Sequence, residues 1–299
     1  TSGFLISAYK KILSDNTKER PGDLLSSMEK KRLLGNVSGY DISPDMIRLS
    51  LANLFLHGFN EDNLKIFEYD TLTSLDRWNE YYDVVLANPP FMTPKGGIRP
   101  HNRFSIKSNR AEVLFVNYIM EHLTPKGRAA IVVPEGIIFQ SGNAYKDLRK
   151  SLIDKSLIGV VSLPSGVFNP YSGVKTSILI LDRDLSQKTD KIFFGKVQND
   201  GYDLGAQRRE IHKNDLPKIK DGVLEYIQNI DNDEVEKHPN LSYVSKEEIL
   251  NSSDIGLSFE RYLKNEIISS SFPLFKIGDL FKTSSGGTPN KNVEEYYKD

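Results

Sequence analysis

The fold of this 299-residue chain is decided by one stretch, Asp83-Val84-Val85-Leu86-Ala87-Asn88-Pro89-Pro90-Phe91. Residues 84–87 are uniformly apolar, which is typical of a strand buried on both faces of a parallel sheet. The two prolines end this strand because proline has no N–H to donate to a strand ladder. Asn88 therefore follows the carboxyl end of a strand, where open α/β sheets bind their ligands. We predict an α/β protein whose active site lies at Asn88.

The residues Asn88, Pro89, Pro90 and Phe91 suit the transfer of a methyl group to an exocyclic amine on an aromatic base. Such an amine is a poor nucleophile because its lone pair is delocalised into the ring. Two acceptors aimed at its N–H bonds favour a pyramidal nitrogen. Asn88 offers its side-chain carbonyl, and Pro89 offers a backbone carbonyl whose orientation is restricted by the two proline rings. Phe91 offers a flat surface on which an extruded base can stack, worth roughly 1–3 kcal/mol. The simpler alternative is a Pro-Pro turn and a core phenylalanine.

This motif resembles that of the amino-methyltransferases that use S-adenosylmethionine, whose adenine-N6 branch carries Asp-Pro-Pro-Tyr or Asn-Pro-Pro-Tyr/Phe. The sequence Gly-Arg-Ala-Ala-Ile-Val-Val-Pro-Glu-Gly at 127–136 narrows the resemblance to the modification subunits of type I restriction-modification systems. The resemblance implies a Rossmann-like, S-adenosylmethionine-dependent methyltransferase sheet, truncated at its first strand. It also implies a carboxyl-terminal extension of mixed or helical structure.

In this family a glycine-rich loop after the first strand binds the cofactor, and Thr1-Ser2-Gly3 resembles the end of that loop. A helix over 4–13 is expected to follow. The first strand and its acidic residue are not among the 299 residues, so we expect the chain alone to bind S-adenosylmethionine weakly or not at all. Residues 15–35 are polar and indicate a helix end and a loop that carry no motif.

Asp41, followed by Ile42, is the first acidic candidate for the cofactor site. It ends an expected second strand over 37–42, where a carboxylate can accept hydrogen bonds from ribose hydroxyls. Its alternative role is to help cap the helix that begins at Ser43 and Pro44.

Asp70 is the second acidic candidate and, together with Thr71, follows a third strand expected over 64–69. Family members place an acidic residue here against the adenine of the cofactor. Glu112 matches another family position close to the cofactor. A carboxylate in the first turn of a helix is also favoured by the helix dipole, so a structural role for Glu112 remains open.

A second aromatic residue is expected to face the target base. In relatives the loop at 164–170 places an aromatic side chain on the other side of the base, and Phe168 matches that side chain. With Phe91 it would form a sandwich that offsets part of the cost of extracting a base, a few kcal/mol. The alternative is that Phe91 and Phe168 are both ordinary core residues.

The segment 95–110, which follows the catalytic strand, is basic and contains no Asp or Glu. Because it leaves the sheet on the ligand side, it can clamp phosphates around an extruded nucleotide. The alternative is a solvated loop that happens to be basic. The candidate DNA-binding residues are Lys95, Arg99, Arg103, Lys107 and Arg110.

Composition limits the other possibilities. The chain is 38% hydrophobic and 26% charged, which is normal for a globular protein. Its formal charge of -1 means that contacts with DNA must come from local patches rather than from the global field. It contains no cysteine, which excludes disulfides and thiolate metal sites, and we expect no metal site of another kind. The apolar runs are too short to span a membrane, so we expect a cytoplasmic protein.

We expect three parts along the chain: an amino-terminally truncated methyltransferase core over 1–185, an extension and linker over 186–270, and the start of a target recognition domain over 271–299. The last part resembles the opening of such domains in type I specificity subunits. There a Lys-aliphatic-Gly-Asp strand leads through a Gly-Gly-Thr-Pro loop to an aromatic stretch, and these residues occur in that order here. The serine run before them suits a linker.

This organisation predicts a polypeptide that fuses modification and specificity functions. The partners it implies are double-stranded DNA, a specificity subunit or fused specificity domain, and a restriction subunit. Two other functions stay open, because Asn-Pro-Pro-aromatic also serves amines of RNA and of protein glutamine, and because a chain with a truncated cofactor loop can act as a non-catalytic assembly platform. A cofactor titration distinguishes the platform from an enzyme.

Overall fold

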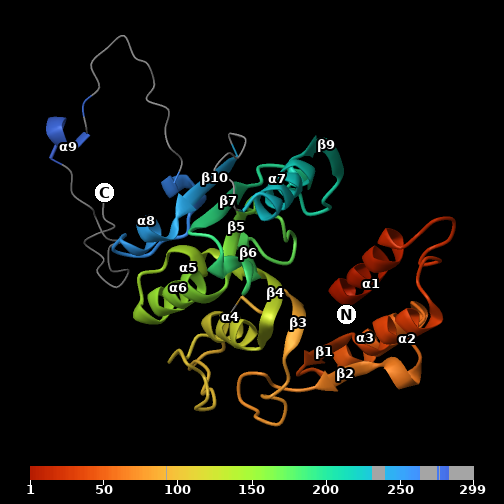
Figure 1. Ribbon diagram of the computed structural model, residues 1–299. Coiled ribbons are helices and arrows are strands. Elements are labelled where there is room, and N and C mark those ends of the chain that lie inside the picture. The colour runs from red at the N-terminus through yellow and green to blue at the C-terminus, as the bar shows by residue number, and fades with distance from the viewer. Residues whose placement is uncertain (92, 231–239, 263–274, 276, 283–299) are drawn as a thin grey trace. The chain divides into compact units, whose positions relative to one another are not determined.

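The computed structural model describes residues 1–91, 93–230, 240–262, 275 and 277–282. The chain divides into two compact units, Thr1–Leu263 and Lys264–Asp299, and the sheets and helical layers described below belong to the first. Its helices and strands, labelled in Figure 1, are α1 (Gly3–Asp15), α2 (Ser27–Gly35), β1 (Ser38–Asp41), α3 (Pro44–Leu56), η1 (Glu61–Asn63), β2 (Lys65–Glu68), β3 (Tyr82–Ala87), α4 (Ala111–Glu121), β4 (Leu123–Pro134), α5 (Glu135–Phe139), α6 (Asn143–Lys155), β5 (Leu157–Ser162), β6 (Thr176–Asp182), η2 (Leu185–Gln187), β7 (Lys191–Lys196), β8 (Asp200–Tyr202), β9 (Glu210–Asn214), α7 (Leu216–Gln228), β10 (Leu241–Ser245), α8 (Lys246–Leu250) and η3 (Phe259–Tyr262).

The centre of this unit is a six-stranded mixed sheet in the order β10-β7-β5-β6-β4-β3. The pairs β3–β4 and β5–β7 are parallel, whereas β6 runs antiparallel to both of its neighbours, β4 and β5. Strand β10 closes the far edge antiparallel to β7. The predicted α/β class is confirmed, and β7 and β10 show that the segment after residue 185 contributes strands to the same sheet as β3.

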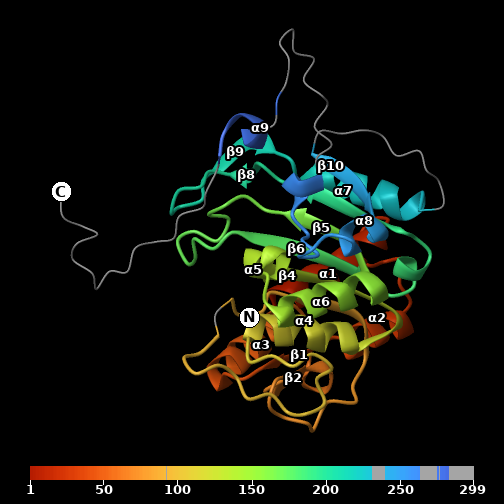
Figure 2. The same cartoon turned by 90° about the vertical axis from the view of Figure 1, so that its left-hand side faces the viewer.

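Helices cover both faces of this sheet, as the side chains of β7 demonstrate. Ile192 and Phe194 belong to one apolar cluster with α4, α5 and α6, whereas Phe193 belongs to another with α7. Because successive side chains of a strand point to opposite faces, α7 lies on the other face from α4 and α6. Helices α4 and α6 run side by side on their face (Figure 2).

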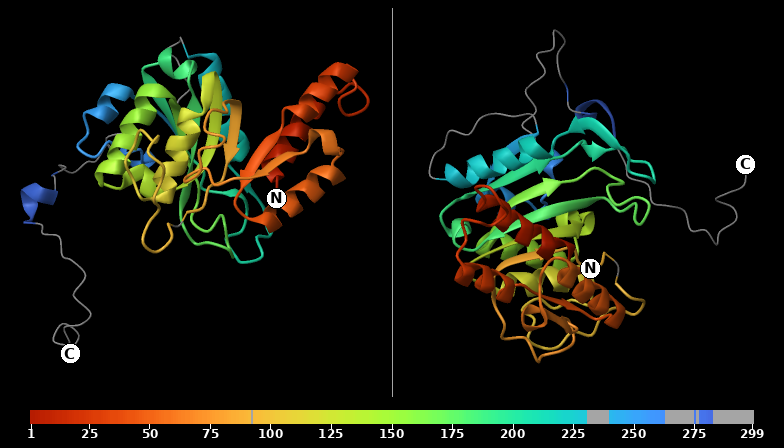
Figure 3. Two further views of the ribbon diagram at one scale, coloured as in Figure 1. Left: turned by 90° about the horizontal axis from the view of Figure 1, so that it is seen from below. Right: turned by 90° about the vertical axis from the view of Figure 1, so that its right-hand side faces the viewer.

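A second, two-stranded parallel sheet, β1–β2, carries its own small core with α1 and α3 (Figure 3). Among the described strands β1 pairs only with β2, and β3 pairs only with β4. One edge of β3 is therefore unpaired, and Val84 and Leu86 are 64% and 38% exposed. The expectation that residues 84–87 are buried on both faces is wrong, because the described residues leave the face of β3 that carries Val84 and Leu86 largely uncovered.

A polar cluster links β1 to the start of β3. The hydroxyl of Tyr40 hydrogen-bonds to Glu80 and to the hydroxyl of Tyr82, and Arg77 forms a 2.7 Å ion pair with Glu80. Burial raises the pKa of Glu80, but hydrogen bonds from Tyr40 and Tyr82 and the charge of Arg77 outweigh it and hold the pKa below the ordinary 4.5. The cluster thus keeps an ionised carboxylate between the two sheets.

A buried arginine fixes the segment after α8 to the helical layer. Arg149, on α6, is fully buried and donates to the carbonyl oxygens of Ile137, Gln140, Asp254 and Ile255 at 2.6–2.9 Å. Burial lowers the pKa of Arg149 to about 10, so its guanidinium stays charged at neutral pH. Since a buried charge needs this many partners, the five residues form one structural unit.

Two local expectations need correction. The polar segment 15–35 contains helix α2, which begins with a capping box: the hydroxyl of Ser26 accepts from the N–H of Glu29, and the Glu29 carboxylate accepts from the N–H of Ser26. In the second unit, residues 277–280 form a short helix, α9, and not the predicted strand, because a strand needs a neighbour for its hydrogen bonds whereas a helical turn does not.

The two compact units divide after Leu263. The expected start of a target recognition domain at residue 271 stays a prediction. Most of residues 271–299 lie outside the described residues. Of the helices that the structure describes, none is long and apolar enough to cross a membrane.

Candidate active site

Asn88 lies where β3 ends, at the carboxyl edge of the sheet. Its side chain is exposed, and within the described residues no hydrogen bond engages it. Pro89 and Phe91 are half-buried, so the chain turns back onto the protein directly after Asn88. The side-chain carbonyl of Asn88 is thus available to accept an N–H from an incoming group.

The structure brings Phe91 and Phe168 together, although they are far apart in the sequence. Their ring centroids are 5.6 Å apart and the ring planes meet at 68°, an edge-to-face contact. A flat base between two rings needs them parallel and further apart, so the rings as placed contact each other and not a common space. Beside Phe168, Asn169 donates to the carbonyl of Leu204 at 2.7 Å, which fixes the loop between β5 and β6.

The two acidic candidates of the cofactor site differ in what they already bind. Asp41, at the end of β1, accepts one hydrogen bond, at Oδ1, from the N–H of Ser43 at 2.9 Å. Asp70 uses both oxygens in its own turn, accepting from the N–H of Leu72 at 2.9 Å and from the hydroxyl of Thr73 at 2.5 Å. Oδ2 of Asp41 therefore remains available for a ligand, whereas Asp70 stabilises the local turn.

The residues at the start of α1 expose a helix amino terminus. Ser2 has a left-handed backbone with φ of 59°, and its carbonyl accepts from the N–H of Ile6 at 3.0 Å, the first bond of the helix. Asn53, on α3, donates to the carbonyl of Thr1 at 2.8 Å. Thr1 and Gly3 are exposed, as is Ile42 at 68%.

The basic side chains between 95 and 110 are exposed on a loop that is itself anchored to the core. Phe104 is buried, and its ring lies 5.1 Å from that of Trp78, while His101 lies 4.2 Å from the same indole. The guanidinium of Arg103 lies 5.3 Å from the Trp78 ring and donates to Asn79 at 3.1 Å. Burial lowers the pKa of His101, so this ring is neutral in the folded loop.

The charged ends in this loop point to solvent and not to acidic partners. Lys95, Arg99, Lys107 and Arg110 are exposed and form no ion pair with the residues that the structure describes. Their positive charge is therefore not neutralised within the described part of the chain.

One contact beside the Asn88–Phe91 loop was not predicted from the sequence. The hydroxyl of Thr93, just beyond Phe91, donates to Glu112 at 2.8 Å, and the hydroxyl of Tyr145 donates to the same carboxylate at 2.6 Å. No spacing in the sequence indicates this, because Tyr145 comes from a helix far along the chain.

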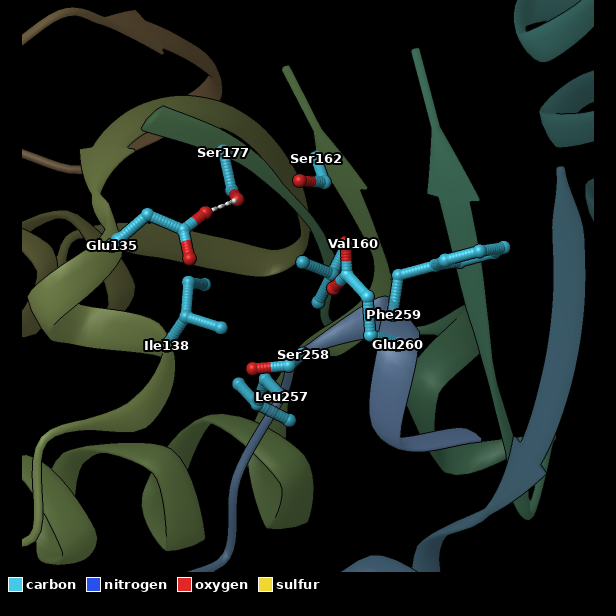
Figure 4. A pocket seen from close by; sticks show the side chains of 9 residues that line it. All are labelled: Glu135, Ile138, Val160, Ser162, Ser177, Leu257, Ser258, Phe259 and Glu260. Atoms are coloured by element: carbon cyan, nitrogen blue, oxygen red, sulfur yellow. Dashed lines mark hydrogen bonds between the residues drawn. The ribbon is translucent and has the colours of Figure 1, made fainter. Parts of the chain in front are cut away.

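A small pocket lies at the carboxyl edges of β4 and β5, and no residue of the Asn88–Phe91 loop lines it (Figure 4). It has no room for a water-sized molecule. Within it the hydroxyl of Ser177 donates to Glu135 at 3.0 Å, and Lys175 lies 3.7 Å from the same carboxylate. The lining residues are Glu135, Ile138, Val160, Ser162, Ser177, Leu257, Ser258, Phe259 and Glu260.

A mixed sheet with one antiparallel strand inserted between parallel ones, together with an Asn-Pro-Pro-Phe loop after an outer strand, defines a methyltransferase-like fold. The comparison with protein families agrees: the model of the N-6 DNA methylase family matches residues 1–270. The chain belongs to this family.

Relatives in sequence are subunits of type I restriction enzymes. The chain is 34% identical over 197 residues to the EcoEI methylase subunit of Escherichia coli, which covers 65% of the chain and 38% of that protein. It is 30% identical over 213 residues to the MpnII methylase subunit of Mycoplasma pneumoniae, which covers 64% of the chain and 38% of that protein. The chain thus spans well under half the length of these relatives.

Solved structures agree on the fold. A chain from a study of complex assembly and conformational transition of the type I R-M system matches with a TM-score of 0.69 and 26% identity, covering 86% of this chain and 52% of that one. The type I restriction enzyme EcoKI M protein matches with a TM-score of 0.67 and 23% identity, covering 86% of this chain and 59% of that one. The Rossmann-like methyltransferase fold is therefore confirmed.

Proposed function

We propose that this chain is the catalytic part of a site-specific DNA adenine-N6 methyltransferase of a type I restriction-modification system, which transfers a methyl group from S-adenosylmethionine to the amine of a flipped adenine. The observation that carries the proposal is the exposed, unengaged side-chain carbonyl of Asn88 at the carboxyl end of β3, followed by Pro89. Membership of the N-6 DNA methylase family supports it.

In this function the chain orients the acceptor amine. The Asn88 side chain and the Pro89 carbonyl accept its two N–H bonds, which leaves the nitrogen lone pair directed at the methyl donor. Phe91 and Phe168 stack on the two faces of the base. Because the two rings are in edge-to-face contact, binding of the base requires that one of them rotates or withdraws.

S-Adenosylmethionine, when bound, supplies the methyl group on its sulfonium. Thr1, Ser2 and Gly3 lie at an exposed helix amino terminus, and Oδ2 of Asp41 is available to a ribose hydroxyl, with Ile42 beside it as an exposed apolar contact. These residues fit a nucleoside ligand. Asp70 and Thr71 would shape the adenine end, Asp70 through the turn that its carboxylate stabilises, and Asn88 would border the methyl group.

We further propose that a strand from outside the 299 residues pairs with the unpaired edges of β1 and β3 and completes this cofactor site. Both strands run parallel to their existing neighbours, and the bond between Tyr40 and Tyr82 links the two edges. Such a strand would pair the backbone N–H and C=O groups on the open edge of β3.

The exposed basic side chains of the loop 95–110 would contact phosphates of double-stranded DNA, next to the loop that holds the target base. A specificity subunit or fused specificity domain would select the sequence, and a restriction subunit is a further candidate partner. A chain that acts on chromosomal DNA would work in the cytoplasm, which fits its lack of cysteine.

The fusion itself is a proposal about residues 271–299, most of which lie outside the described residues. It is supported by the family match, which ends at residue 270, where the resemblance to a target recognition domain begins. Sequencing the complete reading frame decides it, because a frame that stops soon after Asp299 leaves no room for the rest of such a domain.

The function is tested by incubating the full-length protein and its subunits with duplex DNA and S-adenosylmethionine and analysing the nucleosides by mass spectrometry. We expect N6-methyladenine in the DNA and no methylation of RNA or of glutamine-containing peptides. If the methyl groups appear in RNA or in the peptide instead, the substrate is the amine of that molecule and not adenine in DNA. Cofactor binding by the assembled protein without transfer to any of the three substrates would overturn it.

A further inference from the structure

The loop that carries the catalytic motif is tied down by one hydroxyl. Thr93 donates from Oγ1 to a carboxylate oxygen of Glu112, Oε2, at 2.8 Å, and the same Oγ1 accepts from the backbone N–H of Ala111 at 2.9 Å. Ala111 and Glu112 are the first two residues of α4. The hydroxyl of Thr93 therefore binds the segment after Phe91 to the amino terminus of α4 twice, once as a donor and once as an acceptor.

The carboxylate of Glu112 is held in turn by a second helix. The hydroxyl of Tyr145, on α6, donates to its other oxygen, Oε1, at 2.6 Å. Tyr145 is 7% exposed, and burial, followed by the hydrogen bond to Glu112, raises its pKa, so the phenol stays protonated and remains a donor at neutral pH. Glu112 thus joins the catalytic loop, α4 and α6 in one network in which both carboxylate oxygens are engaged.

We propose that Glu112 is a positioning residue: acting through Thr93, it fixes the loop that presents Asn88 and Phe91 to the target base. This inference rests on the proposed methyl transfer. On this assignment the Glu112 carboxylate holds the protein's own loop and does not bind the cofactor, because each of its oxygens already accepts a hydrogen bond from a hydroxyl of the chain. Of these three side chains, Tyr145 is buried, and Thr93 and Glu112 are half-buried.

The chemistry explains why such an anchor affects rate. Asn88 is exposed and has no hydrogen bond of its own within the described residues, so its position depends on the backbone that flanks it. On one side β3 provides that backbone. On the other side the anchor at Thr93 provides it. A misplacement of about 1 Å at reacting groups can cost about 100-fold in rate.

The decisive comparison is Thr93→Val against Thr93→Ser in the full-length, assembled protein. Valine keeps the volume and removes the hydroxyl, whereas serine keeps the hydroxyl. We expect Thr93→Val to lower kcat by about 10- to 100-fold with the affinity for S-adenosylmethionine changed less than about threefold, and Thr93→Ser to recover most of the loss. A matched control is Thr124→Val, which removes a threonine hydroxyl that donates to Asp83 at 2.8 Å on the surface and should leave kcat unchanged.

A double variant tests whether Glu112 acts through Thr93. If it does, Glu112→Gln with Thr93→Val should be no slower than the slower single variant, because both remove the same link. Should Glu112→Gln fail to fold, Tyr145→Phe takes its place, since it removes the other hydroxyl at constant ring volume.

Two results would overturn the assignment. One is equal kcat for the valine, serine and unchanged proteins. The other is a loss of cofactor affinity in Glu112→Gln that accounts for its whole loss of activity, which would place Glu112 in the cofactor site. Both results differ from a failure of the proposed function, because in that case the protein without substitutions would methylate no adenine.

Discussion

Under the proposed function, the side chain of Asn88 accepts a hydrogen bond from the target amine, and within the described residues no hydrogen bond holds that side chain. We predict that Asn88→Ala lowers methylation by about 100- to 1,000-fold, because one of two transition-state acceptors is lost and the freed space admits water. Calorimetry should show an affinity for S-adenosylmethionine within a few-fold of the unchanged protein. A parallel loss of cofactor affinity would instead assign Asn88 a structural role.

At this scale the sequence predicted that the Asn88–Phe91 loop follows a strand, and the structure agrees, but it did not predict what holds the loop. The catalytic role of the loop stays a prediction. The motif and its strand are local, so spacing alone placed Asn88, Pro89 and Phe91. The partner of Thr93 could not be read, because a hydrogen bond between a loop and a distant helix leaves no periodic signal. The stacking role of Phe168 stays a prediction, since the rings meet edge to face and not as a sandwich.

Arg149 stabilises the contact between helix α6 and the segment that follows α8. We predict that Arg149→Met lowers the free energy of unfolding by about 3 kcal/mol or more, because four backbone carbonyls lose their donor in a buried place. Urea denaturation measures it. The same replacement at Arg32, exposed on α2, should cost less than about 0.5 kcal/mol. Similar costs at both positions would contradict the role of the buried bonds.

The link between β1 and β3 should depend on pH. The pKa of Glu80 is lower in the folded chain than its ordinary 4.5, so its contribution is complete above about pH 4.5 and is lost as the pH falls through the lower, folded value. We predict that Tm falls on acidification below pH 4.5 and that Glu80→Gln flattens this part of the profile. Identical profiles for the two proteins would show that other carboxylates dominate.

Elements were predictable where apolar periodicity marks them and not where it is absent. The strands around the motif and the helix that begins at Ser43 and Pro44 agree with the structure to within a few residues. Helix α2 was missed because its sequence is polar; only the serine and glutamate of its capping box, Ser26 and Glu29, indicate it. The pairing of β10 with β7 links distant segments, and no local pattern encodes it.

For the whole molecule, the unpaired edges of β1 and β3 lead to a prediction about cofactor binding and about the protection of backbone amides. We expect residues 1–299 alone to bind S-adenosylmethionine weakly or not at all, and the outward backbone amides of β3 to exchange hydrogen quickly. In the full-length, assembled protein the same amides should be protected, because a strand then covers the edge. Tight binding by residues 1–299 in a calorimetric titration would contradict this.

The place of β6 in the sheet has a consequence for how the protein is made. Strands β4 and β5 follow each other in the chain, but β6 lies between them in the sheet and pairs with both. During synthesis β4 and β5 therefore leave the ribosome with no partner for their facing edges until Asp182 has emerged. Ribosome-bound chains that end before β6 should be digested readily by protease, and chains that extend well past it should resist. Over that interval the Asn88–Phe91 loop has already been made, but the strand that joins the two halves of the sheet behind it has not.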